Sequence, residues 1–142
     1  FFLIWGNRNF NEPLDGIVYG VFVSLGFAWA ENVIYVTHPI LGGYETALER
    51  ALLSVPGHGL FGVRMGYYFA LGKYRSRKRY LPLAFFSPYL AHALYNYFLL
   101  KREPVFWLFF SVLEVRLWGF GLKRIKELQN CSPFREKVSK ES

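Results

Sequence analysis

The chain has 142 residues, of which 53% are hydrophobic and 20% aromatic, and its formal net charge is +7. Its length is that of a single domain, and its only cysteine, Cys131, excludes an internal disulfide and a cysteine metal cluster. Five of the 17 Lys and Arg residues lie in 73–80 and six in 123–140, beside apolar blocks, so the charge indicates membrane topology and not nucleic-acid binding.

The apolar residues come in blocks long enough to cross a bilayer, which takes about 20 residues of helix. Residues 1–5 are expected to be the last turns of an earlier span, so the chain is expected to be an N-terminally truncated fragment. Four further blocks have the length of a span: 14–36, 47–71, 81–100 and 105–122. The predicted fold class is therefore all-α, a polytopic transmembrane helical bundle with four full spans plus the end of an earlier one.

The connecting segments predict an orientation in the cell membrane. Asn11 in the first polar turn is expected to cap a helix whose first turn holds Pro13. The segment 37–46 carries no Lys or Arg and is expected outside, whereas the loop 73–80 and the tail are expected in the cytoplasm. This divides the chain into a transmembrane domain, 1–122, and a basic cytoplasmic tail, 123–142, in contact with the lipid bilayer and with no nucleic acid.

The first full span carries a carboxylate, Glu31, in an apolar run. An ionised side chain inside a span costs at least ~2.5–3.5 kcal/mol on insertion scales and is usually kept for a function. Helical steps place Glu31 on one face with small and polar residues, namely Gly16, Gly20, Ser24 and Phe27. That face is expected to point into the bundle, and the Gly16-x-x-x-Gly20 spacing, like Gly62-x-x-x-Gly66, is typical of close helix packing.

The next two spans place unusual side chains at a similar depth. His58 lies on the second span, and His92 and Asn96 are neighbours at i and i+4 on the third. A rise of ~1.5 Å per residue puts all of them, with Glu31, in the outer half to middle of the bilayer. A shared cavity that opens to the outside is therefore predicted. Pro56 lies shortly before His58 and frees a carbonyl one turn back, although prolines are common in membrane helices.

Other charged residues have less distinctive expectations. Glu114 either neutralises Arg64 or lines the cavity, and the sequence leaves both open. Glu49 and Arg50 are expected to be solvated at the outer mouth of the bundle.

The runs NEPLDGIVYGVFVSLGFAWAENVIY, PGHGLFG and AHALYNY together resemble the PrsW family of intramembrane proteases, which is related to the CAAX prenyl endopeptidases. The resemblance covers about 11–100. Its F-x-x-x-E motif is met by Phe27 and Glu31, its histidine motif by His58, and its H-x-x-x-N motif by His92 and Asn96. The family also carries a glutamate pair, E-E-x-x-K, which would fall upstream of residue 1.

The resemblance implies a glutamic-type intramembrane endopeptidase without metal or cofactor, acting on a single-span membrane protein within or near the membrane. It implies that Glu31, His58, His92 and Asn96 are the catalytic residues. A carboxylate would activate water as a general base, with Glu31 as a second base or as the group that holds a histidine tautomer. His92 and Asn96 would donate to the developing oxyanion, and His58 would orient the water or protonate the leaving amine.

Three other interpretations remain open. Glu31, His58 and His92 form a set that suits zinc with water in the fourth position, although the H-E-x-x-H motif is absent. A polar intramembrane cluster also occurs in transporters, but four or five short spans without an inverted repeat make this less favoured. A catalytically silent relative that binds membrane helices is the third, because the glutamate pair is missing from the chain.

Overall fold

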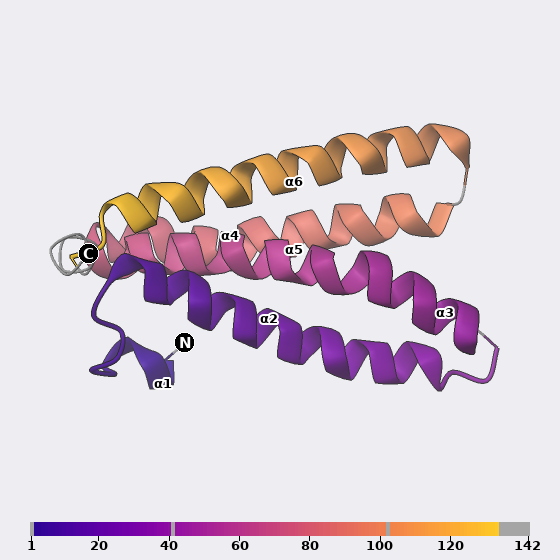
Figure 1. The fold of residues 1–142 in the computed structure, drawn as a ribbon, viewed down its shortest axis with the longest axis horizontal. Helices are drawn as coiled ribbons and strands as arrows, with labels where there is room; N and C mark the ends of the chain where they lie inside the picture. The colour runs from indigo at the N-terminus through magenta and orange to yellow at the C-terminus, as the bar shows by residue number, and fades with distance from the viewer. Residues whose placement is uncertain (1, 41, 102, 134–142) are drawn as a thin grey trace, which may run out of the picture.

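The computed structural model describes residues 2–40, 42–101 and 103–133, and these residues form a bundle of long helices (Figure 1). In the described part of the chain every regular element is helical. Residues 44–74 form one continuous helical stretch, in which a π-helical turn joins two α-helices. The elements are α1 (Phe2–Trp5), α2 (Pro13–Val36), α3 (Tyr44–Glu49), η1 (Arg50–Ser54), α4 (Val55–Tyr74), α5 (Arg77–Lys101) and α6 (Pro104–Asn130).

Each of the four predicted apolar blocks lies within one long helical stretch, which confirms the all-α class. Two helices, α2 and α6, are long and apolar enough to cross a membrane by their own composition. The other two long helices are interrupted by charged and polar residues: α4 carries His58 and Arg64, and α5 begins with the basic run 77–79. The arrangement with four full spans therefore stays a prediction.

The predicted boundaries differ from the structure at two places. Glu12, and not Asn11, is the N-cap of α2, because the Asp15 carboxylate reaches back and accepts the backbone N–H groups of Asn11 and Glu12, each at 3.0 Å. At the other end, α6 continues unbroken past 122 to Asn130. Leu128 is buried there against the core, so the first turns of the predicted tail belong to the bundle. Parts of three predicted segments lie outside the described residues: the earlier span at residue 1, the turn at residue 102 and the tail at 134–142.

The helix α4 is the centre of the bundle and packs against α2, α5 and α6. Its approach to α2 depends on glycines, as their spacing predicts. A Cβ at Gly20 would lie 2.5 Å from the Gly62 carbonyl oxygen, and one at Gly16 would lie 2.8 Å from the Gly66 carbonyl oxygen. Such close backbone contact is the usual way in which helices associate in a membrane. The Ser24 hydroxyl adds a 2.7 Å hydrogen bond to the His58 carbonyl and ties the two helices together at the level of that histidine.

The π-helical turn lies directly before Pro56, whose ring nitrogen has no hydrogen to donate. Two carbonyls in this region accept hydrogen bonds from side chains. The Tyr95 hydroxyl on α5 donates to the Leu53 carbonyl at 2.7 Å, and His58 Nδ1 lies 2.7 Å from the Ser54 carbonyl. The irregular turn is thus held from a neighbouring helix and from within its own helix. Turns of this kind are frequent at functional sites.

Candidate active site

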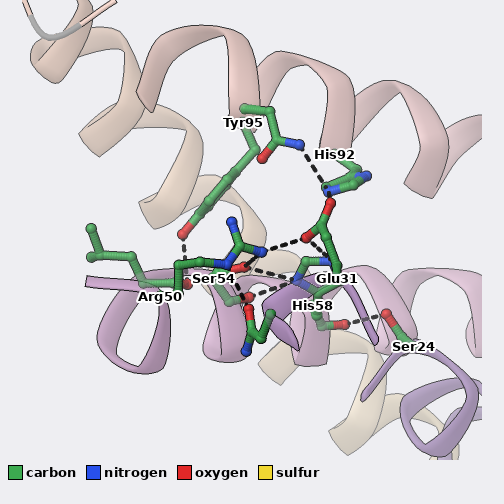
Figure 2. Close-up of polar contacts among 10 residues, drawn as sticks. Ser24, Glu31, Arg50, Ser54, His58, His92 and Tyr95 are labelled. Atoms are coloured by element: carbon green, nitrogen blue, oxygen red, sulfur yellow. Dashed lines mark hydrogen bonds and ion pairs between the residues drawn. The ribbon is translucent and has the colours of Figure 1, made fainter. Parts of the chain in front are cut away.

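Three helices bring one ionisable side chain each to a single point (Figure 2). Glu31 comes from α2, His58 from α4 and His92 from α5. His58 Nε2 lies 3.5 Å from Glu31 Oε2, and His92 Nε2 lies 3.7 Å from Glu31 Oε1. One nitrogen or oxygen from each of the three residues falls within 4.8 Å of the others. The structure therefore brings together residues that lie 27 and 34 positions apart in the sequence.

The ring of His58 is fixed in one tautomer by the irregular turn. Its Nδ1 atom lies 2.7 Å from the Ser54 carbonyl oxygen, which can only accept a hydrogen bond, so Nδ1 carries the hydrogen. In the neutral ring, Nε2 then presents a lone pair. That atom is buried, faces the Glu31 carboxylate, and has no hydrogen-bond partner among the described residues. A buried nitrogen without a partner indicates that something else binds there.

The ring of His92 is held by the fourth predicted site residue. Asn96 Nδ2 lies 3.1 Å from His92 Nε2, and an amide nitrogen can only donate. His92 Nε2 therefore accepts this hydrogen bond with its one electron pair, and that pair would become available to a metal ion only when Asn96 releases it. Asn96 was expected to donate to a reaction intermediate, but in this structure it donates to His92 and sets the orientation of that ring.

Arg50 is a residue of the site that sequence reasoning missed. Its Nη2 atom lies 2.6 Å from Glu31 Oε2 and donates to Ser54 Oγ at 3.0 Å, while its Nε donates to Asn32 Oδ1 at 2.7 Å. The guanidinium also lies over the Tyr35 ring, 4.1 Å from its centroid. The Arg50 side chain is only 13% exposed, so the expectation of a solvated arginine is wrong.

The reason for the miss is local, and a signal was present. Arg50 begins the π-helical turn and meets α2 from within the bundle, where the ion pair offsets the cost of a buried carboxylate. In the sequence, Arg50, Ser54 and His58 follow one another at four-residue spacing. That spacing places an arginine on the same helix face as the histidine.

Aromatic rings enclose the two histidines. Phe61 is buried below them, with its ring centroid 5.7 Å from that of His58 and 5.3 Å from that of His92. Phe27 lies on the open side at 5.8 Å and 6.0 Å from the same rings and is 55% exposed. Phe27 on α2 thus contacts the rings of both histidines, from α4 and from α5, and covers the cluster on its exposed side.

The other two charged residues that the sequence left open have separate partners. Arg64 donates a hydrogen bond to the Ser87 hydroxyl, and its guanidinium lies 4.8 Å from the centroid of the Phe120 ring. Glu114 interacts with the Tyr95 hydroxyl. Among these contacts Glu114 pairs with Tyr95. In these contacts it neither neutralises Arg64 nor lines the cavity.

The chemistry of the cluster fits a bound cation. The lone pair of His58 Nε2 faces one carboxylate oxygen of Glu31 at 3.5 Å, and His92 Nε2 lies 3.7 Å from the other, distances at or beyond the limit of a hydrogen bond. Two histidines and one carboxylate are a ligand set of catalytic zinc sites, which keep a further position for water. The bond from His58 Nδ1 to a backbone carbonyl is also the support that metal-bound histidines usually have.

The fold and the site define the class of protein: in its described residues it is a helical bundle with two helices apolar enough to cross a membrane, and a Glu–His–His cluster lies where three helices meet. The sequence profile of a family described as "PrsW family intramembrane metalloprotease" matches residues 1–119. The chain belongs to the PrsW family.

Curated relatives bear the same family name. The chain is 40% identical over 130 residues to "Protease PrsW" of Geobacillus kaustophilus, covering 89% of this chain and 56% of that relative. It is 37% identical over 133 residues to "Protease PrsW" of Bacillus subtilis, covering 91% of this chain and 59% of that relative. The chain thus spans a little over half the length of these relatives. No solved structure matches it.

Proposed function

We propose that the chain is part of an intramembrane endopeptidase that hydrolyses peptide bonds of membrane-embedded or membrane-proximal substrates, and that Glu31, His58 and His92 hold a zinc-like divalent metal ion. The names of the relatives and of the family support the peptidase activity. The observation that carries the metal is the cluster itself: three ligand atoms within 4.8 Å, one of them a buried nitrogen without a partner.

Each residue around the cluster has a role in this proposal. A zinc ion held by Glu31, His58 and His92 would supply an activated water and would polarise the substrate carbonyl. The Ser54 carbonyl keeps His58 in the tautomer that offers Nε2, and Asn96 keeps the His92 ring in place. Arg50 binds one carboxylate oxygen of Glu31 and leaves the other facing His92.

The metal-free glutamic mechanism is the competing proposal. In it Glu31 takes the proton of the attacking water. Two features of the structure favour the metal over this mechanism. Glu31 Oε2 is already engaged by Arg50 at 2.6 Å, and the buried His58 Nε2 faces the carboxylate as an acceptor without a hydrogen-bond partner among the described residues.

A zinc chelator separates the two mechanisms. With the protein reconstituted in liposomes together with single-span substrate peptides, we expect chelation to abolish cleavage and added Zn²⁺ to restore it, because the open metal position supplies the nucleophile. Product formation is followed by mass spectrometry, and Glu31→Gln in parallel is expected to lose activity under all conditions. Cleavage that is insensitive to the chelator but lost in Glu31→Gln would support the glutamic mechanism instead.

We further propose that the protein lies in the cell membrane with the loop 73–80 and the C-terminal tail in the cytoplasm, and that its substrates are single-span membrane proteins. The basic residues support this orientation, because they gather in that loop and in the tail. Figure 1 shows that the α4–α5 connection and the C-terminal end of α6 lie at one end of the bundle, and the α2–α3 and α5–α6 connections at the other.

The sole cysteine tests the orientation directly. Cys131 is exposed at the end of α6. We expect a membrane-impermeant maleimide to label it only after the cells are permeabilised, because this end of the bundle is proposed to be cytoplasmic. A matched control, Thr37→Cys in a Cys131→Ser background, moves the thiol to the opposite end and should be labelled in intact cells. Labelling of Cys131 in intact cells would reverse the proposed orientation.

A further inference from the structure

A cavity of about 360 Å³ lies beside the Glu–His–His cluster. It is formed at the end of the bundle where α2 turns into α3 and α5 turns toward α6 (Figure 1). Its walls come from four parts of the fold: the end of α2, the α3–η1 stretch, the end of α5 and the first turn of α6. The wall residues that matter here are Tyr35, Arg50, Leu53, Ser54, Leu99 and Trp107.

The cavity borders the site at two residues that contact the cluster. Arg50 and Ser54 line the cavity, and Arg50 also binds Glu31 Oε2 at 2.6 Å. The Ser54 carbonyl accepts the hydrogen bond that fixes His58. An extended peptide advances by about 3.3 Å per residue. Because Arg50 contacts both Glu31 and the cavity, a peptide bond placed at the cluster would direct a side chain a short way along the substrate toward the cavity.

The chemistry of the walls selects the side chain. Leucines and aromatic rings supply most of the lining. The Arg50 guanidinium makes hydrogen bonds to Glu31, Asn32 and Ser54, so its charge is already balanced within the chain and does not recruit an acidic residue. The volume lies at the lower end of the range for ligand pockets, about 300–1,000 Å³, which suits one large side chain.

We propose that this cavity is a specificity subsite that receives a bulky apolar side chain, such as Phe or Leu, of a substrate residue close to the scissile bond. The inference rests on the proposed peptidase function and adds to it the class of residue that the site selects. Trp107 on α6 and Leu99 on α5 line the cavity without contributing to the Glu–His–His cluster, and their size sets how large a side chain fits.

The test uses single-span peptides that carry Ala or Phe at each position around the cleavage site, with the protein in liposomes. For the wild type we expect kcat/KM to favour Phe over Ala by about 10-fold or more at one position, as hydrophobic pockets do. Leu99→Trp fills the cavity and should bring this ratio to about 1. Leu94→Trp is the matched control, since Leu94 lies on the same helix with its side chain 39% exposed, and it should keep the wild-type ratio.

A second variant distinguishes a filled cavity from a misfolded protein, because it is expected to gain a preference and not to lose one. Trp107→Ala enlarges the cavity and is expected to extend the preference from Phe to Trp at the same position. A wild-type ratio that Leu99→Trp and Trp107→Ala both leave unchanged would overturn the inference, as would an equal loss of the ratio in Leu94→Trp.

A binding measurement separates this inference from the proposed function. The affinity of fluorescently labelled Phe and Ala peptides for His58→Ala protein is measured by anisotropy, so no cleavage is required. Tighter binding of the Phe peptide that Leu99→Trp removes would support the subsite even if the wild type cleaved nothing, in which case the peptidase proposal alone would fall. Equal binding of both peptides would overturn the subsite, whether or not the wild type cleaves.

Discussion

Replacing His58 with alanine is expected to lower the affinity for Zn²⁺ by more than about 100-fold and to abolish cleavage. Loss of a group that only supports a metal ligand costs about 10–100-fold, and loss of a ligand itself should cost more. His58 is the best-placed of the three ligands, because its Nε2 is buried, lacks a partner and is held in the right tautomer by the Ser54 carbonyl. Metal content after equilibrium dialysis and the absorption spectrum of the Co²⁺-loaded protein measure the effect.

The chain supplies its own matched control for that experiment. His38 lies in the α2–α3 connection, where its Nδ1 accepts a hydrogen bond from the Ile40 N–H. His38→Ala removes an imidazole from outside the cluster and should keep the wild-type metal affinity and Co²⁺ spectrum. His58→Asn serves as a smaller change if the alanine variant unfolds. If His58→Ala and His38→Ala bind metal as tightly as the wild type, the cluster is not the metal site.

The helices were predictable because their signals are local. Four long apolar blocks each became one helical stretch, and the small residues on α2 and α4 became the tightest contact of the bundle, as the Gly16 and Gly62 spacings indicate. Helical periodicity also placed Glu31 on an inward face. The shared cavity of Glu31, His58 and His92 was predicted from their depths in the bilayer, which require only the rise per residue of a helix.

The parts that the sequence did not reveal depend on contacts between helices. Arg50 was assigned to solvent, since a charged residue near a helix end is usually solvated, and only the π-helical turn and the presence of Glu31 on α2 explain its burial. The contact of Asn96 with His92 follows from ring orientation, which spacing does not specify. The cavity beside the cluster is formed by four segments together, so no single segment predicts it.

Replacing Arg50 with glutamine is expected to destabilise the metal-free protein by about 3–5 kcal/mol, the usual cost of removing one partner of a buried ion pair. The side chains of Arg50 and Glu31 are 13% and 15% exposed, so water does little to compensate the carboxylate. A bound dication provides a second compensating charge. We therefore expect Zn²⁺ to raise the Tm of Arg50→Gln by more than it raises the Tm of the wild type.

Arg50→Lys and Arg64→Gln make this expectation specific. Lysine keeps the charge but cannot reach Glu31, Asn32 and Ser54 with one planar group, so it should recover only part of the stability. Arg64, which bonds Ser87, tests the loss of an arginine that is not beside the cluster, and Arg64→Gln should leave the zinc-dependent rise in Tm as in the wild type. An equal rise in Arg50→Gln and the wild type would show that Arg50 does not share the carboxylate with the metal. In that case Arg50 would be a packing residue of the π-helical turn, and other groups would compensate the charge of the Glu31 carboxylate.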